Sequence, residues 1–160
     1  MLIIADSSAL VALALCDGLE LLNRLFEQVR VPQAVYDEVI VEGKPAAQML
    51  QNYLKGKVVP VPLENVVITG AGLGRGEIEA MALYKSMRAD YLLIDDNRAR
   101  KVARLNHVRI TGSQGVLLLA KHNGLISHVR PYLEQLRATD IWISDRLIER
   151  TLALAGETDD

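Results

Sequence analysis

The segment YLLIDDNRARKVARL, residues 91–105, gives the clearest indication of the fold, because a short apolar run meets two acids and then a stretch of helical period. Residues 91–94 have the length and composition of a buried strand, and residues 97–105 have those of a helix that follows it. The same order of strand and helix recurs along the chain, which favours βα units and a parallel sheet. We therefore predict an α/β fold.

The other predicted elements continue this alternation. The expected strands cover residues 2–5, 29–31, 58–61, 91–94, 108–110 and 141–143, although two of these runs could equally be extended connections. The expected helices cover residues 7–15, 19–28, 33–41, 46–54, 76–87, 97–105, 113–122 and 127–137, and a last helix follows Ser144. Ser113 and Ser144 stand where a hydroxyl could cap the amides of a helix start.

The composition is that of one globular domain. A chain of 160 residues, half of them apolar and 24% charged, can bury a core without staples. Cys16 is the only cysteine, which excludes an internal disulfide and a thiolate zinc site within the chain. The first residues carry no basic stretch and the apolar run 9–15 is too short to span a bilayer, so we expect a cytoplasmic protein. The acidic end from Glu157 is expected to fray.

The charge pattern allows nucleic-acid binding only at a local site. A net charge of −2 is unlike that of proteins that coat nucleic acid through a general basic excess. A candidate patch is formed by Arg98, Arg100, Lys101, Arg104 and Arg109, which could meet phosphates. The same residues are equally compatible with a solvated helix face.

Three acids stand directly after predicted strands. Asp6 follows the first strand, and Asp95 and Asp96 follow the strand at 91–94. Ligands of parallel sheets collect at the carboxyl ends of strands, which makes these acids candidate metal ligands. The alternative is that each acid caps a helix, although capping does not readily explain two adjacent acids. Ser7 and Ser8 could orient a metal-bound water or cap a helix themselves.

Two glutamates lie on apolar helix faces, where an uncompensated carboxylate is costly. Glu38 shares a face with Ala34, Val35 and Val41, although the periodicity also admits Asp37.

The second glutamate, Glu77, follows the turn GLGRGE (72–77) and aligns with Ala80, Met81 and Tyr84. It could instead complement a helix dipole, with Glu79 as an exposed companion. The turn lacks the lysine and the glycine spacing of nucleotide-binding loops, so we exclude that role.

Converging carboxylates favour hydrolysis of phosphodiesters assisted by hard divalent ions, which prefer oxygen ligands. The histidines, His107, His122 and His128, lack the spacing of a metalloprotease helix, and no nucleophile motif accompanies them. Trp142 is expected to pack in the interior. Because only 4% of the residues are aromatic, we do not expect a surface on which nucleobases stack.

Taken in order and spacing, several segments resemble the PIN domain. They are IIADSSAL (3–10), VPQAVYDEVI (31–40), GRGEIEAMALY (74–84), LLIDDNRARKVARL (92–105) and TGSQGVLLLAKHNGLI (111–126), followed by a helix near VRPYLEQLR (129–137). The chain is most similar to a prokaryotic PIN subfamily of predicted nucleic-acid-binding proteins related to the VapC-type toxins. The resemblance covers a single domain of about residues 1–150, with 151–160 as the end of the last helix and the acidic tail.

The resemblance implies a three-layer α/β/α sandwich with a mainly parallel sheet, a central first strand and an acidic pocket that binds Mg²⁺ or Mn²⁺ for RNA cleavage. The family's acids correspond to Asp6, Glu38, Glu77 and Asp95, with Asp96 as an alternative or additional ligand, and the serines Ser7 and Ser8 support them. Nucleic-acid contacts are expected at Arg98, Arg100, Lys101 and Arg104.

Two departures from the family pattern leave alternatives open. Many of the toxins carry aspartate where this chain has Glu77, and IDDNRAR lacks the threonine and phenylalanine found in the corresponding toxin segment. The expected protein is a metal-dependent endoribonuclease, with a small antitoxin and a second copy of the chain as further partners. The alternative is a catalytically idle PIN-like module that binds nucleic acid or protein.

Overall fold

The computed structural model describes residues 1–62, 72–141 and 143–158. Its sheet contains five parallel strands, β1 (Leu2–Ala5), β2 (Gln28–Pro32), β3 (Val58–Val59), β4 (Tyr91–Leu93) and β5 (Ile110–Thr111), within these residues. Their order is β3-β2-β1-β4-β5, so the first strand is central. The α/β fold and the parallel sheet are thereby confirmed.

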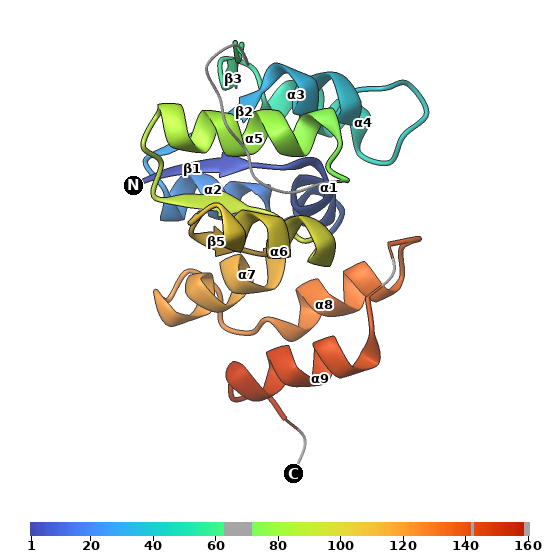
Figure 1. Ribbon diagram of the computed structural model, residues 1–160. Helices are drawn as coiled ribbons and strands as arrows, with labels where there is room; N and C mark the ends of the chain where they lie inside the picture. Colours follow the sequence, from blue (N-terminus) through green and yellow to red (C-terminus); the bar gives the residue numbers. More distant parts are fainter. Residues whose placement is uncertain (63–71, 142, 159–160) are drawn as a thin grey trace.

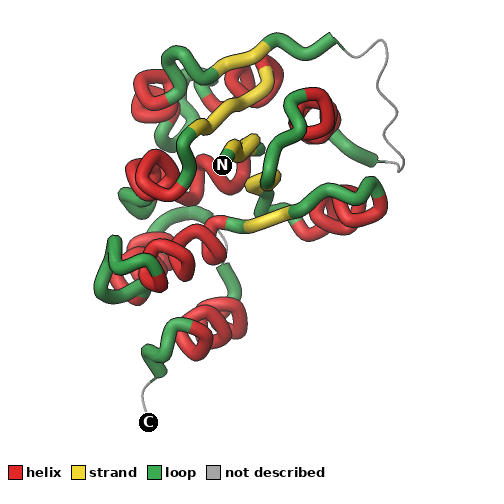
Figure 2. Tube along the Cα trace, turned by 90° about the vertical axis from the view of Figure 1, so that its left-hand side faces the viewer, coloured by secondary structure: helices red, strands yellow, loops and turns green. Residues whose placement is uncertain are grey.

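Helices connect consecutive strands and continue beyond the last one. They are α1 (Ser7–Leu15), α2 (Leu19–Leu25), α3 (Gln33–Val39), α4 (Ala47–Tyr53), α5 (Arg75–Ser86), α6 (Asn97–Leu105), α7 (Ser113–His122), α8 (Arg130–Arg137) and α9 (Asp145–Leu154). Figure 2 shows helices on both sides of the strands, as expected for a three-layer sandwich. None of the helices in this described part of the chain is long and apolar enough to cross a membrane.

The central strand separates two apolar cores, because successive side chains of a strand point to opposite faces. Ile3 and Ala5 pack with residues of α1, α2, α7, α8 and α9 in one core. Ile4 packs with residues of α5 and α6 in the other. Ile3 and Ile4 are fully buried, and each such side chain contributes about 1.5–3 kcal/mol to stability. This burial on both faces fixes where β1 ends, and therefore where Asp6 stands.

Several predicted boundaries were wrong because pairing or packing overrides local pattern. Helix α2 ends at Leu25, before the predicted residue 28, since Gln28 already pairs with Leu2. Helix α8 begins at Arg130 instead of residue 127, with Pro131 in its first turn.

The predicted strand at 141–143 does not form at Ile141 or Ile143, which pack against the core that contains Ile3. Trp142 lies outside the described residues, so the expectation that it packs in the interior stays a prediction.

The chain is anchored near its end at Glu157, where fraying was expected. The carboxylate of Glu157 accepts hydrogen bonds from Lys121 Nζ (2.9 Å) and the amides of Val129 (2.8 Å) and Arg130 (3.2 Å). These contacts hold the pKa of Glu157 below its usual range against the opposing effect of burial. The segment after α9 is therefore tied to the start of α8, and the prediction of fraying was wrong at Glu157.

Candidate active site

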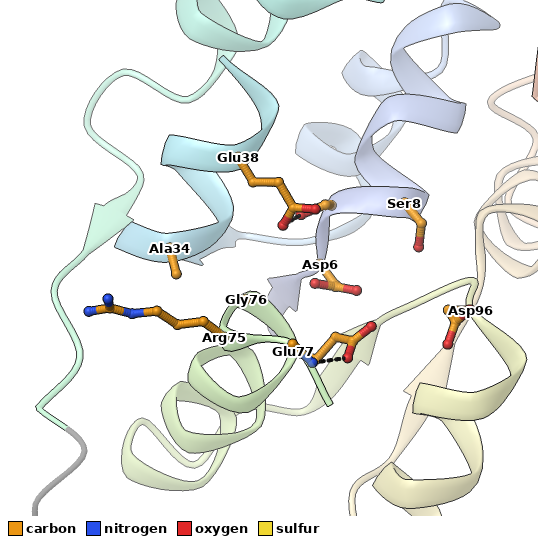
Figure 3. A pocket seen from close by; sticks show the side chains of 10 residues that line it. Asp6, Ser8, Ala34, Glu38, Arg75, Gly76, Glu77 and Asp96 are labelled. Carbon is orange, nitrogen blue, oxygen red and sulfur yellow. Dashed lines mark hydrogen bonds between the residues drawn. The ribbon is translucent and has the colours of Figure 1, made fainter. Parts of the chain in front are cut away.

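An acidic pocket lies at the carboxyl ends of β1 and β4, where the strand order reverses direction. Parallel sheets bind ligands at such points. The pocket has a volume of about 500 Å³. Its lining includes Asp6, Ser7, Ser8, Ala34, Glu38, Gly74, Arg75, Gly76, Glu77 and Asp96. Figure 3 shows Asp6, Glu38, Glu77 and Asp96 reaching this space from the end of β1 and from α3, α5 and the start of α6.

Asp6 is the most buried of the four carboxylates, with an exposed fraction of 4%. Its backbone amide donates to Leu93 O (2.9 Å), which ties the end of β1 to β4. The residue occupies the N-cap position of α1, but its side chain accepts no capping hydrogen bond there. Capping therefore does not explain why a carboxylate is buried at this place.

The electrostatic environment of Asp6 favours its protonated form in the metal-free protein. Burial is the largest cause, and together with the nearby carboxylates of Glu77, Glu38 and Asp96 it raises the pKa of Asp6 from 3.8 to about 7. The Ser7 amide partly offsets these effects. A cation in the pocket would reverse this balance, because it would stabilise several carboxylates together.

Glu38 enters the pocket from α3, whereas Asp37 does not line it. The Glu38 carboxylate accepts a hydrogen bond from Ser7 Oγ at 2.8 Å. Asp37 accepts instead from the side-chain amide of Gln33 at 2.9 Å. Helical periodicity could not decide which of these two acids belongs to the site, and in the structure it is Glu38 that lines the pocket. Ser8 lines the same pocket with an exposed side chain.

Glu77 serves the start of α5 as well as the pocket. One of its oxygens accepts from the Gly74 amide at 2.8 Å, so the helix-terminus interpretation holds for that oxygen. Gly76 lies close to side chains of the neighbouring elements. A Cβ at this position would lie 3.1 Å from Glu38 Oε2 and 3.9 Å from Asp6 Oδ1. Because Gly76 has no side chain, the turn GLGRGE brings the start of α5 close to the carboxylates of Glu38 and Asp6.

The adjacent acids Asp95 and Asp96 have different surroundings. Asp96 lines the acidic pocket and caps α6 by accepting from the Ala99 amide at 2.8 Å. Asp95 does not line this pocket. Its two oxygens accept from the amide and the hydroxyl of Ser113, both at 2.7 Å. Asp95 therefore holds the start of α7 against the end of β4, while Asp96 is grouped with Asp6.

Glu79 and Arg75 were not predicted as site residues. Glu79, expected to be exposed, has an exposed fraction of only 2%, so that expectation was wrong. It accepts from the Ala34 amide (3.1 Å), at the start of α3, and from Arg75 Nε (2.9 Å). The buried residues Ala82 and Leu83, three and four positions after Glu79, were the signal in the sequence that Glu79 faces inward.

The residue types of the pocket suit a hard divalent ion, since carboxylate oxygens are the ligands that Mg²⁺ and Mn²⁺ prefer. Yet within the parts of the chain that the structure describes, no three acidic, histidine or cysteine side chains are grouped so that they could hold a metal ion. Glu38, Glu77 and Asp96 each direct one oxygen to a protein donor. The donor chemistry fits the ion, and the carboxylates are not assembled as a ligand set.

The predicted basic patch is divided by the structure. Arg100, Lys101 and Arg104 line one groove beside α6. Arg98 lies instead against Gly72, where a Cβ would collide with its guanidinium. Arg109 stacks on the ring of Tyr91, with Cζ 4.9 Å from the ring centroid. Only part of the patch is therefore available as one continuous surface.

Comparison with known proteins agrees with this architecture. Residues 2–157 match a family model described as a PIN domain. Neither the curated proteins nor the solved structures gave a match. Since the family model spans nearly all of the chain, and the parallel sheet carries its acidic pocket where the resemblance requires it, the chain belongs to the PIN-domain family.

Proposed function

We propose that this protein is a metal-dependent endoribonuclease. PIN domains are generally nucleases and generally use divalent metals. The observation that carries the proposal is the convergence of Asp6, Glu38, Glu77 and Asp96 on one pocket, with the pKa of Asp6 raised by burial and by the other three acids. Grouping like charges around a buried carboxylate costs stability, and such arrangements are characteristic of functional sites.

The carboxylates of Asp6, Glu38, Glu77 and Asp96 would hold Mg²⁺ or Mn²⁺. When bound, such an ion activates water and offsets the charge that develops on the phosphate during hydrolysis. Asp6 supplies its charge from the floor of the pocket, and Ser7 orients Glu38 through its hydrogen bond. We propose that Asp96, and not Asp95, takes the fourth ligand position, because both oxygens of Asp95 are engaged by Ser113. We propose that Ser8, which lines the pocket, orients water there.

The test is cleavage of a labelled structured RNA with Mg²⁺ or Mn²⁺, compared with EDTA and with the Asp6→Asn variant. The matched control is Asp37→Asn, which makes the same chemical change on an exposed carboxylate outside the pocket. We expect activity that requires both metal and Asp6 and that survives Asp37→Asn. Equal cleavage by the wild type and Asp6→Asn would reject the proposal.

A second candidate is a catalytically idle module that binds nucleic acid or protein. It is favoured by the lack of a ready metal-holding group within the described residues. The two candidates differ in one measurement, because the idle module would bind RNA or protein without metal-dependent cleavage.

We further propose two partners, a small antitoxin that covers the acidic pocket and a second copy of this chain. Exposed apolar side chains such as Val41, Met49 and Leu154 would suit such contacts. Light scattering of the purified protein measures the homodimer directly as twice the monomer mass. Restored cell growth on co-expression with the product of an adjacent gene tests the antitoxin.

A further inference from the structure

A second hollow adjoins the acidic pocket and leads to a third. The middle pocket, about 390 Å³, shares Ser8 and Asp96 with the acidic pocket. The third hollow, a basic groove of about 500 Å³, shares Asp95, Asn97, Gln114 and Leu147 with the middle pocket. The three hollows therefore form a continuous track that begins at the acids and ends between α6, α7 and α9, three elements that lie on the same side of β1 in Figure 1.

The basic groove gathers four cations, Arg100, Lys101 and Arg104 from α6 and Arg150 from α9. Over the described residues, none of the four forms a salt bridge with a carboxylate. The chain as a whole carries a net charge of −2, so this is a local excess of positive charge. Arg100 is half-buried and donates to Ile94 O at 3.1 Å, whereas Lys101, Arg104 and Arg150 are exposed. Exposed cations along a groove suit a polyanion, whose phosphates displace counterions.

The middle pocket has a different chemistry from the hollows on either side. Leu136, Ile141, Ile143 and Leu147 supply apolar walls, and Asn97 and Gln114 add side-chain amides. The carboxylates of Asp95 and Asp96 also line this pocket, and they accept hydrogen bonds from Ser113 and from the Ala99 amide. An unpaired nucleobase has apolar faces and polar edges, and amides pair well with such edges. A paired duplex would keep those faces stacked and those edges occupied. The middle pocket therefore suits one unpaired base.

We infer that a single RNA strand follows this track, with its phosphates along the basic groove, one base in the middle pocket and the scissile bond at the acids. Helix α9 is then a wall of the substrate site, and Arg150 is a phosphate-binding residue. This inference rests on the proposed function for the position of the scissile bond. The binding of RNA in the groove has a test that does not depend on cleavage.

The experiment measures binding of a short labelled single-stranded RNA to the Asp6→Asn protein, so that cleavage cannot interfere. Arg150→Ala is compared with Arg24→Ala, because Arg24 is an exposed arginine in the last turn of α2 that lines none of the three hollows. We expect Arg150→Ala to weaken binding about fivefold and to reduce the salt dependence, d log K/d log[salt], by about 0.7. Arg24→Ala should change the affinity less than about twofold.

Lys101→Ala, paired with Lys55→Ala as its control, repeats the comparison from the other wall of the groove. If Arg150→Ala and Arg24→Ala bind the RNA with equal affinity, the inference is overturned, and the groove would be a candidate site for a protein partner. Equal affinity of the Asp6→Asn protein for a fully paired RNA would overturn it as well, because the middle pocket requires an unpaired base.

Cleavage assays on proteins that keep Asp6 distinguish the proposed RNA track from the proposed nuclease activity. Cleavage by the wild type with unchanged binding by Arg150→Ala would refute only the track. Weakened binding by Arg150→Ala, without cleavage by the wild type under any metal, would refute only the nuclease.

Discussion

Replacing Asp6 by asparagine should stabilise the metal-free protein at neutral and alkaline pH. Asp6 is buried, and three further carboxylates raise its pKa in the same direction as burial does. Ionised Asp6 therefore costs folding free energy when no cation is present. Asparagine has nearly the same shape and carries no charge, so it removes that cost while it fills the same space.

The size of the effect follows from the two pKa values. Folding raises the pKa of Asp6 from 3.8 to about 7, a difference of about 3. The folded state thus binds more protons than the unfolded state between these values, and stability falls as pH rises through this window. At about 1.4 kcal/mol per pKa unit, the full cost is roughly 4 kcal/mol. It is nearly complete at pH 8 and less than half as large at pH 5.

The assay is urea unfolding of wild type and Asp6→Asn in EDTA from pH 5 to pH 8, with Asp37→Asn as the control for the same change at an exposed site. The advantage of Asp6→Asn should grow with pH. Saturating Mg²⁺ or Mn²⁺ should then stabilise the wild type more than the variant. If Asp6→Asn is no more stable than the wild type at pH 8 in EDTA, the account of a strained buried carboxylate is wrong.

Three further predictions follow from the neighbouring contacts. Glu79→Ala should lower the free energy of unfolding by about 1–3 kcal/mol, because the Ala34 amide loses a buried acceptor; a loss below 0.5 kcal/mol in urea would contradict this. Asp95→Ala should also lower the free energy of unfolding by about 1–3 kcal/mol, yet preserve metal binding. Asp96→Ala should instead weaken metal binding measured by calorimetry. Metal binding lost in Asp95→Ala and kept in Asp96→Ala would show that Asp95 is the ligand. Gly76→Ala should change the stability of the metal-free protein by less than about 1 kcal/mol but reduce the rise in melting temperature that Mn²⁺ produces, since the added methyl lies between Glu38 and Asp6. An unchanged Mn²⁺ response would show that this close approach does not matter.

The central part of the fold could be predicted because local pattern and tertiary structure agree there. Strand β1 and helices α1, α6 and α7 have the predicted bounds, since each apolar run is also buried. The edge strands were harder to predict, because β3 and β5 have only two residues each in the ladder. At Ile141 and Ile143 an apolar run packs on the core without pairing at all.

Within the site, the sequence could indicate which acids follow strands but not which acids meet. Asp95 and Asp96 are equivalent in local pattern, and Asp95 is set apart by Ser113, eighteen residues further along the chain. Arg150 reaches the same groove as α6 only through the packing of α9 against α7, which no local pattern encodes. Contacts of this kind depend on the tertiary arrangement alone.

The hydrogen bond between Glu79 and the Ala34 amide has a consequence for the choice of ion. Glu38 belongs to α3 and Glu77 to α5, and the bond joins the start of α3 to α5. Together with the packing of α3 on α5, the span between the two carboxylates thus depends on a residue that does not line the acidic pocket. Mg²⁺ demands shorter and more regular coordination than larger ions such as Ca²⁺. A change at Glu79 would therefore alter the preference among ions while every carboxylate of the pocket stays in the sequence.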